Sequence, residues 1–154
     1  ISFDPNLRYS LWKDRQSLLD MVKEYIPLAD ILKVSDEELF DITGIADEKT
    51  AVKEEFCGKV KLVIVTKGSK GATAYTQNSE VFVPSIKVEK VVDTTGAGDS
   101  FMGATLYQLI KNGFNFSAEV LKKILTYSNK TAGDVVGGQG AIQSMPTGEQ
   151  IFGK

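Results

Sequence analysis

Hydrophobic residues along the chain form two kinds of pattern, short continuous runs and longer stretches with helical spacing. The clearest run is VKLVIVT over Val60–Thr66, which is typical of a buried strand. Shorter strands are expected at Ile1–Phe3, Ile31–Val34, Ala72–Thr76 and Val81–Val83. We expect the last two of these to form a hairpin that turns at Gln77-Asn78.

Helical spacing is clearest in Leu18, Val22 and Ile26, which share one face of a segment that Pro27 ends. A long helix capped by Ser117 is expected to bury a face made of Leu121, Ile124, Leu125 and Ser128. Other helices are expected from Ser35 to about Thr43 with Gly44 as the stop, from Asp47 to about Phe56, and from about Ser100 to Lys111.

Strands that alternate with helices predict an α/β layered sheet with mostly parallel pairing. The chain has 154 residues and shows no internal repeat, low-complexity tract or clear linker. We therefore interpret residues 1–154 as belonging to one domain. Ile1 is not an initiator methionine, and the first residues already resemble the end of a strand, so we expect this to be part of a longer chain.

Composition excludes several classes of function. The formal net charge is -2 and no long basic run is present, so nucleic acid is not an expected partner. No apolar stretch approaches the roughly 18 residues that cross a bilayer, so no membrane association is expected. Cys57 is the only cysteine, which favours a cytoplasmic protein. The chain has no histidine, so acid–base chemistry must use carboxylates, lysine or tyrosine.

The densest chemical signal is DTTGAGDSFMG, from Asp93 to Gly103. Gly96 and Gly98 let backbone N–H groups approach an anion closely, and the expected helix points its positive end at the same place. Asp99 at that helix start can accept a proton from an attacking hydroxyl. The alternative is a glycine-rich turn in which Asp99 is a plain helix cap.

The string DTTGAGDSFMGA resembles the C-terminal signature of the PfkB, or ribokinase-like, carbohydrate kinases. The resemblance covers nearly the whole chain. It implies a three-layer, Rossmann-like α/β sheet with helices on both faces, truncated at its N-terminus. It also implies ATP and Mg²⁺ as cofactors. Asp99 would be the base on the sugar hydroxyl, and Gly96, Ala97 and Gly98 would form the anion hole. Asp93, Thr95 and Ser144 would bind a monovalent cation such as K⁺.

The segment TKGSKG after the best strand is similar to the nucleotide loop T-x-G-x-x-G of the same family. The resemblance implies contacts with ATP from Thr66, Lys67, Gly68, Ser69 and Gly71. A Walker A motif is absent from the sequence. Taken alone, the segment is also compatible with an ordinary hairpin turn rich in glycine and lysine.

Ser35-Asp36-Glu37-Glu38 has two interpretations. It has the pattern of a capping box, in which Ser35 is the N-cap and Glu38 reaches back to its N–H. The family resemblance instead places Glu38 in the N-x-x-E motif, which organises Mg²⁺, here through a metal-bound water. Ser35 stands where that motif usually has asparagine. Both interpretations can hold at once.

Other resemblances concern the two substrates. Asn129 resembles the residue that lines the adenine pocket, although it can also be an ordinary polar helix residue. Gly140-Ala141-Ile142 resembles the segment that closes this pocket. Asp4-Pro5-Asn6-Leu7-Arg8 resembles a strand end of bacterial fructokinases and 2-keto-3-deoxygluconate kinases. Arg8 suits an anionic ligand, with a turn and a surface arginine as the alternative. The segment Ile31–Gly44 resembles fructokinases, and this resemblance favours fructose as the sugar.

Two classes of function remain open at this stage. One is the ATP-binding, catalytic-base half of a sugar kinase, and the other is a non-catalytic nucleotide-binding or assembly module. A chain that lacks part of its sheet exposes surface built to be covered. We therefore expect this piece, if stable alone, to form a symmetric homodimer and to phosphorylate sugars poorly.

Overall fold

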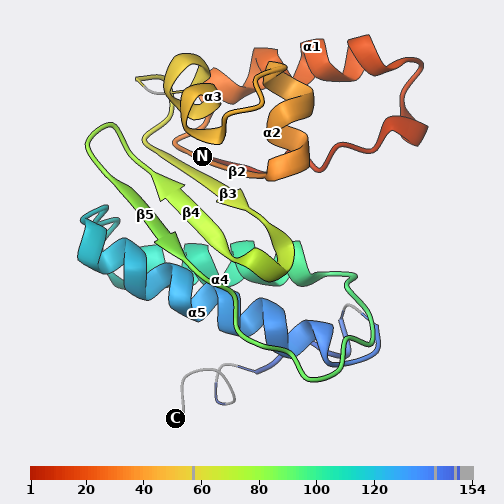
Figure 1. The fold of residues 1–154 in the computed structure, drawn as a ribbon, viewed down its shortest axis with the longest axis vertical. Helices are drawn as coiled ribbons and strands as arrows, with labels where there is room; N and C mark the ends of the chain where they lie inside the picture. The colour runs from red at the N-terminus through yellow and green to blue at the C-terminus, as the bar shows by residue number, and fades with distance from the viewer. Residues whose placement is uncertain (57, 141, 148, 150–154) are drawn as a thin grey trace. The chain divides into compact units, whose positions relative to one another are not determined.

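The structure, a computed structural model, describes residues 1–56, 58–140, 142–147 and 149 (Figure 1). These residues contain a five-stranded sheet in the order β1-β2-β3-β4-β5. The strands are β1 (Ser2–Phe3), β2 (Ile31–Ser35), β3 (Leu62–Thr66), β4 (Ala72–Tyr75) and β5 (Glu80–Val83). β2 pairs in parallel with both β1 and β3. Every strand expected from the sequence is present, although β3 begins at Leu62 rather than Val60.

The described helices are α1 (Arg15–Tyr25), α2 (Asp36–Thr43), α3 (Glu48–Glu55), α4 (Ala97–Lys111) and α5 (Ala118–Val136). Short 3-10 turns lie at η1 (Tyr9–Leu11), η2 (Ile26–Leu28) and η3 (Gly68–Lys70). The expected capping of α2 is confirmed, since Ser35 and Glu38 form a capping box and Gly44 ends the helix with φ 74°. Within the described residues, no helix is both long and apolar enough to span a membrane.

The chain divides into two compact units. Unit 1 comprises Ile1–Lys67 and Thr73–Glu80, and unit 2 comprises Gly68–Ala72 and Val81–Lys154. The core of unit 1 forms where β2 and β3 bury aliphatic side chains against α1 and α2. Its members include Leu18, Val22, Leu32, Val34, Leu39, Ile42, Val63 and Val65. Packing of this core fixes where β2 and β3 end, and therefore where the segments that follow them begin.

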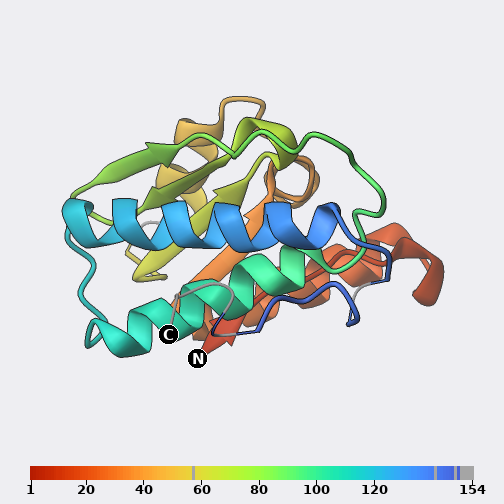
Figure 2. The same ribbon diagram turned by 90° about the horizontal axis from the view of Figure 1, so that it is seen from below.

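Unit 2 is built on α4 and α5, which lie side by side in both views (Figures 1 and 2). The face of α5 expected to be buried is confirmed, because Leu121, Ile124, Leu125 and Ser128 are at most 1% exposed. Ser128 and Thr105 of α4 join their hydroxyl groups at 2.8 Å in the interior. Ser128 also donates its hydroxyl to the Ile124 carbonyl at 3.0 Å, so the Thr105 hydroxyl donates to Ser128 and would lose this buried partner if the two helices shifted.

The helix predicted to start at about Ser100 starts earlier. The helix begins at Ala97, with Gly96 as its N-cap in the left-handed region at φ 82°. Glycine is poorly suited to a helix interior, so the sequence GAG indicates a loop rather than a first turn. At the N-cap, however, a positive φ requires glycine, and the chain can enter the helix directly from it.

Candidate active site

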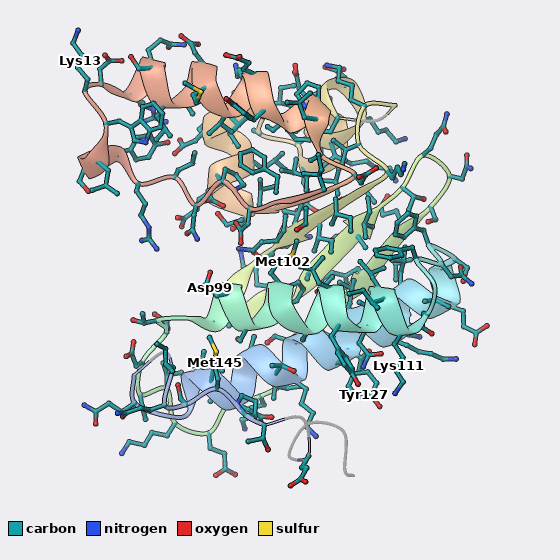
Figure 3. The ribbon with its side chains drawn as sticks, turned by 180° about the vertical axis from the view of Figure 1, so that it is seen from behind. Lys13, Asp99, Met102, Lys111, Tyr127 and Met145 are labelled. Carbon is teal, nitrogen blue, oxygen red and sulfur yellow. The ribbon has the colours of Figure 1, made fainter. Side chains whose placement is uncertain are left out.

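Asp99 lies in the first turn of α4, where its carboxylate is exposed (Figure 3). It is the third residue of the helix, and Gly96 occupies the N-cap position. The interpretation of Asp99 as a plain helix cap is therefore wrong. Among the residues that the structure describes, Asp99 has no side-chain hydrogen-bond partner. Its carboxylate is thus available to a group outside the chain.

The backbone N–H groups around Asp99 are only partly used by the fold. The N–H of Ala97 donates to the carbonyl of Thr94 at 3.2 Å, and that of Ser100 donates to Gly96 at 2.9 Å. In the described part of the chain, the N–H groups of Gly98 and Asp99 have no acceptor. Unpaired N–H groups at the positive end of a helix form a place for an anion. Gly98 therefore suits the predicted anion hole better than Ala97 does.

Asp93 holds the loop that leads into α4. Its carboxylate accepts the N–H of Thr95 at 2.8 Å and the N–H of Gly140 at 3.3 Å. Hydrogen bonds from the side chain and the backbone of Thr95, with a smaller one from Gly140, hold the pKa of Asp93 below its usual range. The loop is thus fixed at its start by an ionised carboxylate.

The residues predicted to hold a monovalent cation gather around Gly140. The Ser144 hydroxyl donates to the carbonyl of Gly140, while the N–H of Gly140 donates to Asp93. One glycine therefore joins Asp93 and Ser144, and Thr95 contacts the other oxygen of Asp93. The sequence interpretation gave Gly140 only as part of the segment that closes the adenine pocket and did not connect it to the cation residues. The predicted adenine contact Ala141 lies outside the described residues.

The nucleotide-like loop is closed by η3, in which the N–H of Gly71 donates to Gly68 at 3.2 Å. Gly68 and Ser69 are exposed, whereas Gly71 is buried. A Cβ on Gly71 would lie 2.2 Å from the carbonyl oxygen of Val83, and its φ is +117°. The last glycine of the motif is therefore needed for a close backbone approach to β5.

Asn129 of α5 is buried and contacts the same part of the chain. Its Nδ2 donates to the carbonyls of Val83 and Pro84, each at 3.1 Å. Two predicted nucleotide-site residues, Gly71 and Asn129, thus both lie against the backbone of Val83-Pro84. The amide donor of Asn129 is used within the protein, so any contact with adenine would have to come from the rest of its side chain.

Lys67 is engaged within unit 1. Its Nζ lies 2.9 Å from Glu48 Oε2 and donates to Thr73 Oγ1 at 2.7 Å. Thr66 Oγ1 makes a long contact of 3.4 Å with the Val34 carbonyl. Glu48 also accepts the Tyr75 hydroxyl at 2.7 Å. The sequence interpretation missed Glu48, because nothing in local spacing connects it to the loop.

Glu38 forms the predicted capping box. Its Oε2 accepts the N–H of Ser35 at 2.9 Å, and Ser35 Oγ accepts the N–H of Glu38 at 3.1 Å. Its Oε1 also accepts the N–H of Leu7 at 2.9 Å, which fixes the segment before Arg8 on α2. The Arg8 side chain is exposed. Both carboxylate oxygens of Glu38 therefore already have a protein donor.

A buried ion pair in unit 1 was also missed. Lys33 in β2 is 6% exposed, and its Nζ lies 2.9 Å from Asp4 Oδ2. The pair fixes the end of β1 on β2. A lysine inside the apolar run Ile31–Val34 was the available signal, since lysine is seldom buried without a partner.

Residues 1–148 match the sequence pattern of the pfkB family carbohydrate kinases. The chain belongs to this family. Among curated relatives, this pfkB-family chain is 41% identical over 149 residues to probable fructokinase-5 of Arabidopsis thaliana. It is 37% identical over 154 residues to fructokinase-1 of Zea mays. These alignments cover 96% and 99% of the chain but only 46% and 47% of the relatives. The chain thus spans about half the length of the relatives it matches.

Solved structures give the same result for the fold. A Vibrio cholerae fructokinase double mutant in a fructose-, ADP- and potassium-bound form matches with a TM-score of 0.85 and 32% identity. The match covers 99% of this chain and 49% of that one. Aminoimidazole riboside kinase from Salmonella enterica, with its riboside and an ATP analog, matches with a TM-score of 0.83 and 29% identity, over 97% of this chain and 50% of that one. The predicted ribokinase-like α/β fold class is confirmed.

Proposed function

We propose that this chain is the ATP-binding and catalytic-base part of a sugar kinase, with fructose as the acceptor. The observation that carries the proposal is the first turn of α4. There the exposed carboxylate of Asp99 lies in the same turn as the N–H groups of Gly98 and Asp99, which have no acceptor among the described residues. Phosphoryl transfer needs both elements at one place, a proton acceptor and a stabiliser of negative charge.

In this mechanism Asp99 accepts the proton of the attacking sugar hydroxyl. The oxygen then attacks the γ-phosphorus of ATP, and the bond to the β-phosphate oxygen breaks. The N–H of Gly98 and the positive end of α4 stabilise the charge on the transferred group. The turn of Gly68–Lys70 and the segment Gly96–Gly98 belong to the same unit, and the triphosphate would lie between them. Adenine would lie near Asn129 and Ala141.

The metal ions of the proposed reaction place different demands on the chain. Each oxygen of Glu38 already accepts one N–H, so its remaining lone pairs fit a metal-bound water better than the ion itself. Bound Mg²⁺ would neutralise part of the negative charge of the phosphates. Asp93, Thr95 and Ser144 offer carboxylate and hydroxyl oxygens of the hard type that K⁺ prefers, and Gly140 already draws Asp93 and Ser144 together.

Support for fructose comes from the relatives. The matched plant proteins carry the name fructokinase, and the Vibrio cholerae structure contains fructose and ADP. Arg8 is exposed and suits an anionic group, which would be a phosphate or, in the alternative sugar, a carboxylate, because fructose itself is uncharged. The aminoimidazole riboside kinase shows that a similar fold also serves another acceptor. We therefore propose fructose first, with 2-keto-3-deoxygluconate as the alternative sugar.

A non-catalytic nucleotide-binding module is the competing function. Such a module would use the N–H groups of the α4 turn but has no use for a carboxylate beside bound phosphates, where its charge is repulsive. The test is a substrate screen of the full-length protein with ATP and Mg²⁺. We expect fructose to be phosphorylated with the highest kcat/KM. ATP binding with no acceptor phosphorylated would contradict the proposal and support the module.

A further inference from the structure

The most connected group of charged and polar side chains outside the α4 turn surrounds Glu48. This carboxylate lies 2.9 Å from the Lys67 ammonium and accepts the hydroxyl of Tyr75 at 2.7 Å. The same ammonium donates to Thr73 at 2.7 Å. All four residues belong to unit 1. Together they form a chain of contacts, Tyr75–Glu48–Lys67–Thr73, that we call the Glu48 clamp.

The Glu48 clamp holds the two ends of Gly68–Ala72, the segment that contains the glycines of the nucleotide-like loop. Lys67 immediately precedes Gly68–Ala72, and Thr73 immediately follows it. The bond from Lys67 to Thr73 therefore joins the residue that enters the segment to the residue that leaves it. Glu48 anchors this bond to the first turn of α3. A loop held at both ends loses less conformational entropy when a ligand orders it.

Burial makes the contacts of the clamp strong. Thr73 is 2% exposed and Tyr75 is 6% exposed, while the Lys67 and Glu48 side chains are 20% and 22% exposed. Burial, together with the hydrogen bond to Glu48, raises the pKa of Tyr75, so its hydroxyl stays protonated and donates. An ion pair with this little exposure is screened weakly, and the loss of one partner leaves the other charge uncompensated.

We propose that Glu48 is a positioning residue for the nucleotide loop, acting through Lys67 rather than through contact with ATP. This inference rests on the proposed function, because that function supplies ATP as the ligand of the loop. The contacts among Glu48, Lys67 and Thr73 are observed in the structure. It also changes the expected role of Lys67. The sequence resemblance made Lys67 a direct contact of ATP, whereas the structure directs its ammonium at Glu48 and Thr73.

The two roles of Lys67 predict opposite behaviour of Glu48 variants. If Lys67 only holds the loop, then Glu48→Gln and Lys67→Met both disorder it and weaken ATP binding. If Lys67 contacts a phosphate, Glu48→Gln frees its ammonium, and ATP binding is unchanged or tighter. The matched control is Glu80→Gln, which breaks the Lys49–Glu80 pair at 2.5 Å. That pair joins the same helix start to the same hairpin with more exposed partners.

The experiment measures the KM for ATP, kcat, and amide hydrogen exchange of Gly68–Gly71 in the full-length protein. We expect Glu48→Gln and Lys67→Met each to raise KM about threefold to tenfold, with kcat nearly unchanged. The double variant should have a KM for ATP no higher than that of the single variant with the higher KM, because both substitutions break the same chain of contacts. Loop amides should exchange faster in each, and Glu80→Gln should behave like the unmodified protein.

Two results would overturn the proposal. One is a raised KM in Lys67→Met with a lowered or unchanged KM in Glu48→Gln. The other is unchanged exchange of the loop amides in both variants. If no acceptor is phosphorylated by the unmodified protein, the proposed function fails, but the exchange measurement still decides the role of the clamp. Tyr75→Phe, which removes one hydroxyl, is the milder variant to use if Glu48→Gln does not fold.

Discussion

The carboxylate of Asp93 accepts the backbone N–H of Gly140, 47 residues along the chain, at 3.3 Å. Its other oxygen accepts the N–H of Thr95 at 2.8 Å. One side chain therefore ties the start of the loop before α4 to the segment after α5. The position of Asp99 depends on that loop, so the geometry of the proposed base is set partly from a distant point in the sequence.

The charge of Asp93 gives this tie a pH dependence. Because hydrogen bonds lower its pKa in the folded state, ionised Asp93 stabilises the fold above the unfolded value of about 3.9. That stability is lost as the pH falls through the lower, folded pKa. We expect the amide proton shift of Gly140 to titrate with a midpoint below the usual pKa of an aspartate. Asp93→Asn should abolish the titration, and a midpoint above the usual value would contradict the assignment.

The close approach of Gly71 to Val83 predicts a large effect of a single methyl group. Gly71→Ala places a Cβ against the Val83 carbonyl and the Pro84 backbone at a φ of +117°. Gly113→Ala is the matched control, with φ +60° and no atom within 4 Å. The control should lose about 1–2 kcal/mol of unfolding free energy from its backbone alone. Gly71→Ala should lose about 1–3 kcal/mol more, from the clash and from a φ outside the left-handed well that Gly113 occupies, measured by denaturant unfolding. Equal losses would contradict the packing.

Asn129 should matter for stability as well as for any nucleotide contact. Asn129→Ala removes the donor to the Val83 and Pro84 carbonyls and should cost about 1–3 kcal/mol. Asn129→Asp should cost more, because it sets acceptor oxygens against two carbonyls. Asn78→Asp in the exposed hairpin turn is the control for the same chemical change. If Asn129→Asp is as stable as the unmodified protein, the donor assignment is incorrect.

The sequence predicted the secondary-structure elements better than it predicted the contacts between distant residues. Strands, helices and the Ser35 cap depend on neighbours in the chain, so periodicity and turn residues predicted them. The start of α4 was missed because Gly96 acts through its positive φ, which composition does not show. Glu48 was missed, and Gly140 was not connected to the cation residues, for another reason. Their partners Lys67 and Asp93 are distant in sequence, and only tertiary packing brings these pairs together.

The two roles of Glu38 can be separated by one substitution. Glu38→Gln keeps one acceptor oxygen, but its NH2 group replaces the other, so the N–H of either Ser35 or Leu7 loses its acceptor. The protein should lose about 1–3 kcal/mol of stability. If the carboxylate also orients metal-bound water, the Mg²⁺ concentration for half-maximal rate should rise. Glu37→Gln on the same helix turn is exposed and serves as the control. An unchanged Mg²⁺ requirement would leave Glu38 a purely structural residue.

The central claim is that Asp99 is the base of a phosphoryl transfer. Asp99→Asn in the full-length protein keeps the size of the side chain and the N–H groups of the α4 turn, but removes the proton acceptor. The decisive measurement is kcat with fructose, ATP and Mg²⁺, together with the dissociation constant of ATP. We expect kcat to fall about 10²–10⁴-fold while ATP affinity changes little. Near-normal turnover in Asp99→Asn would contradict the claim.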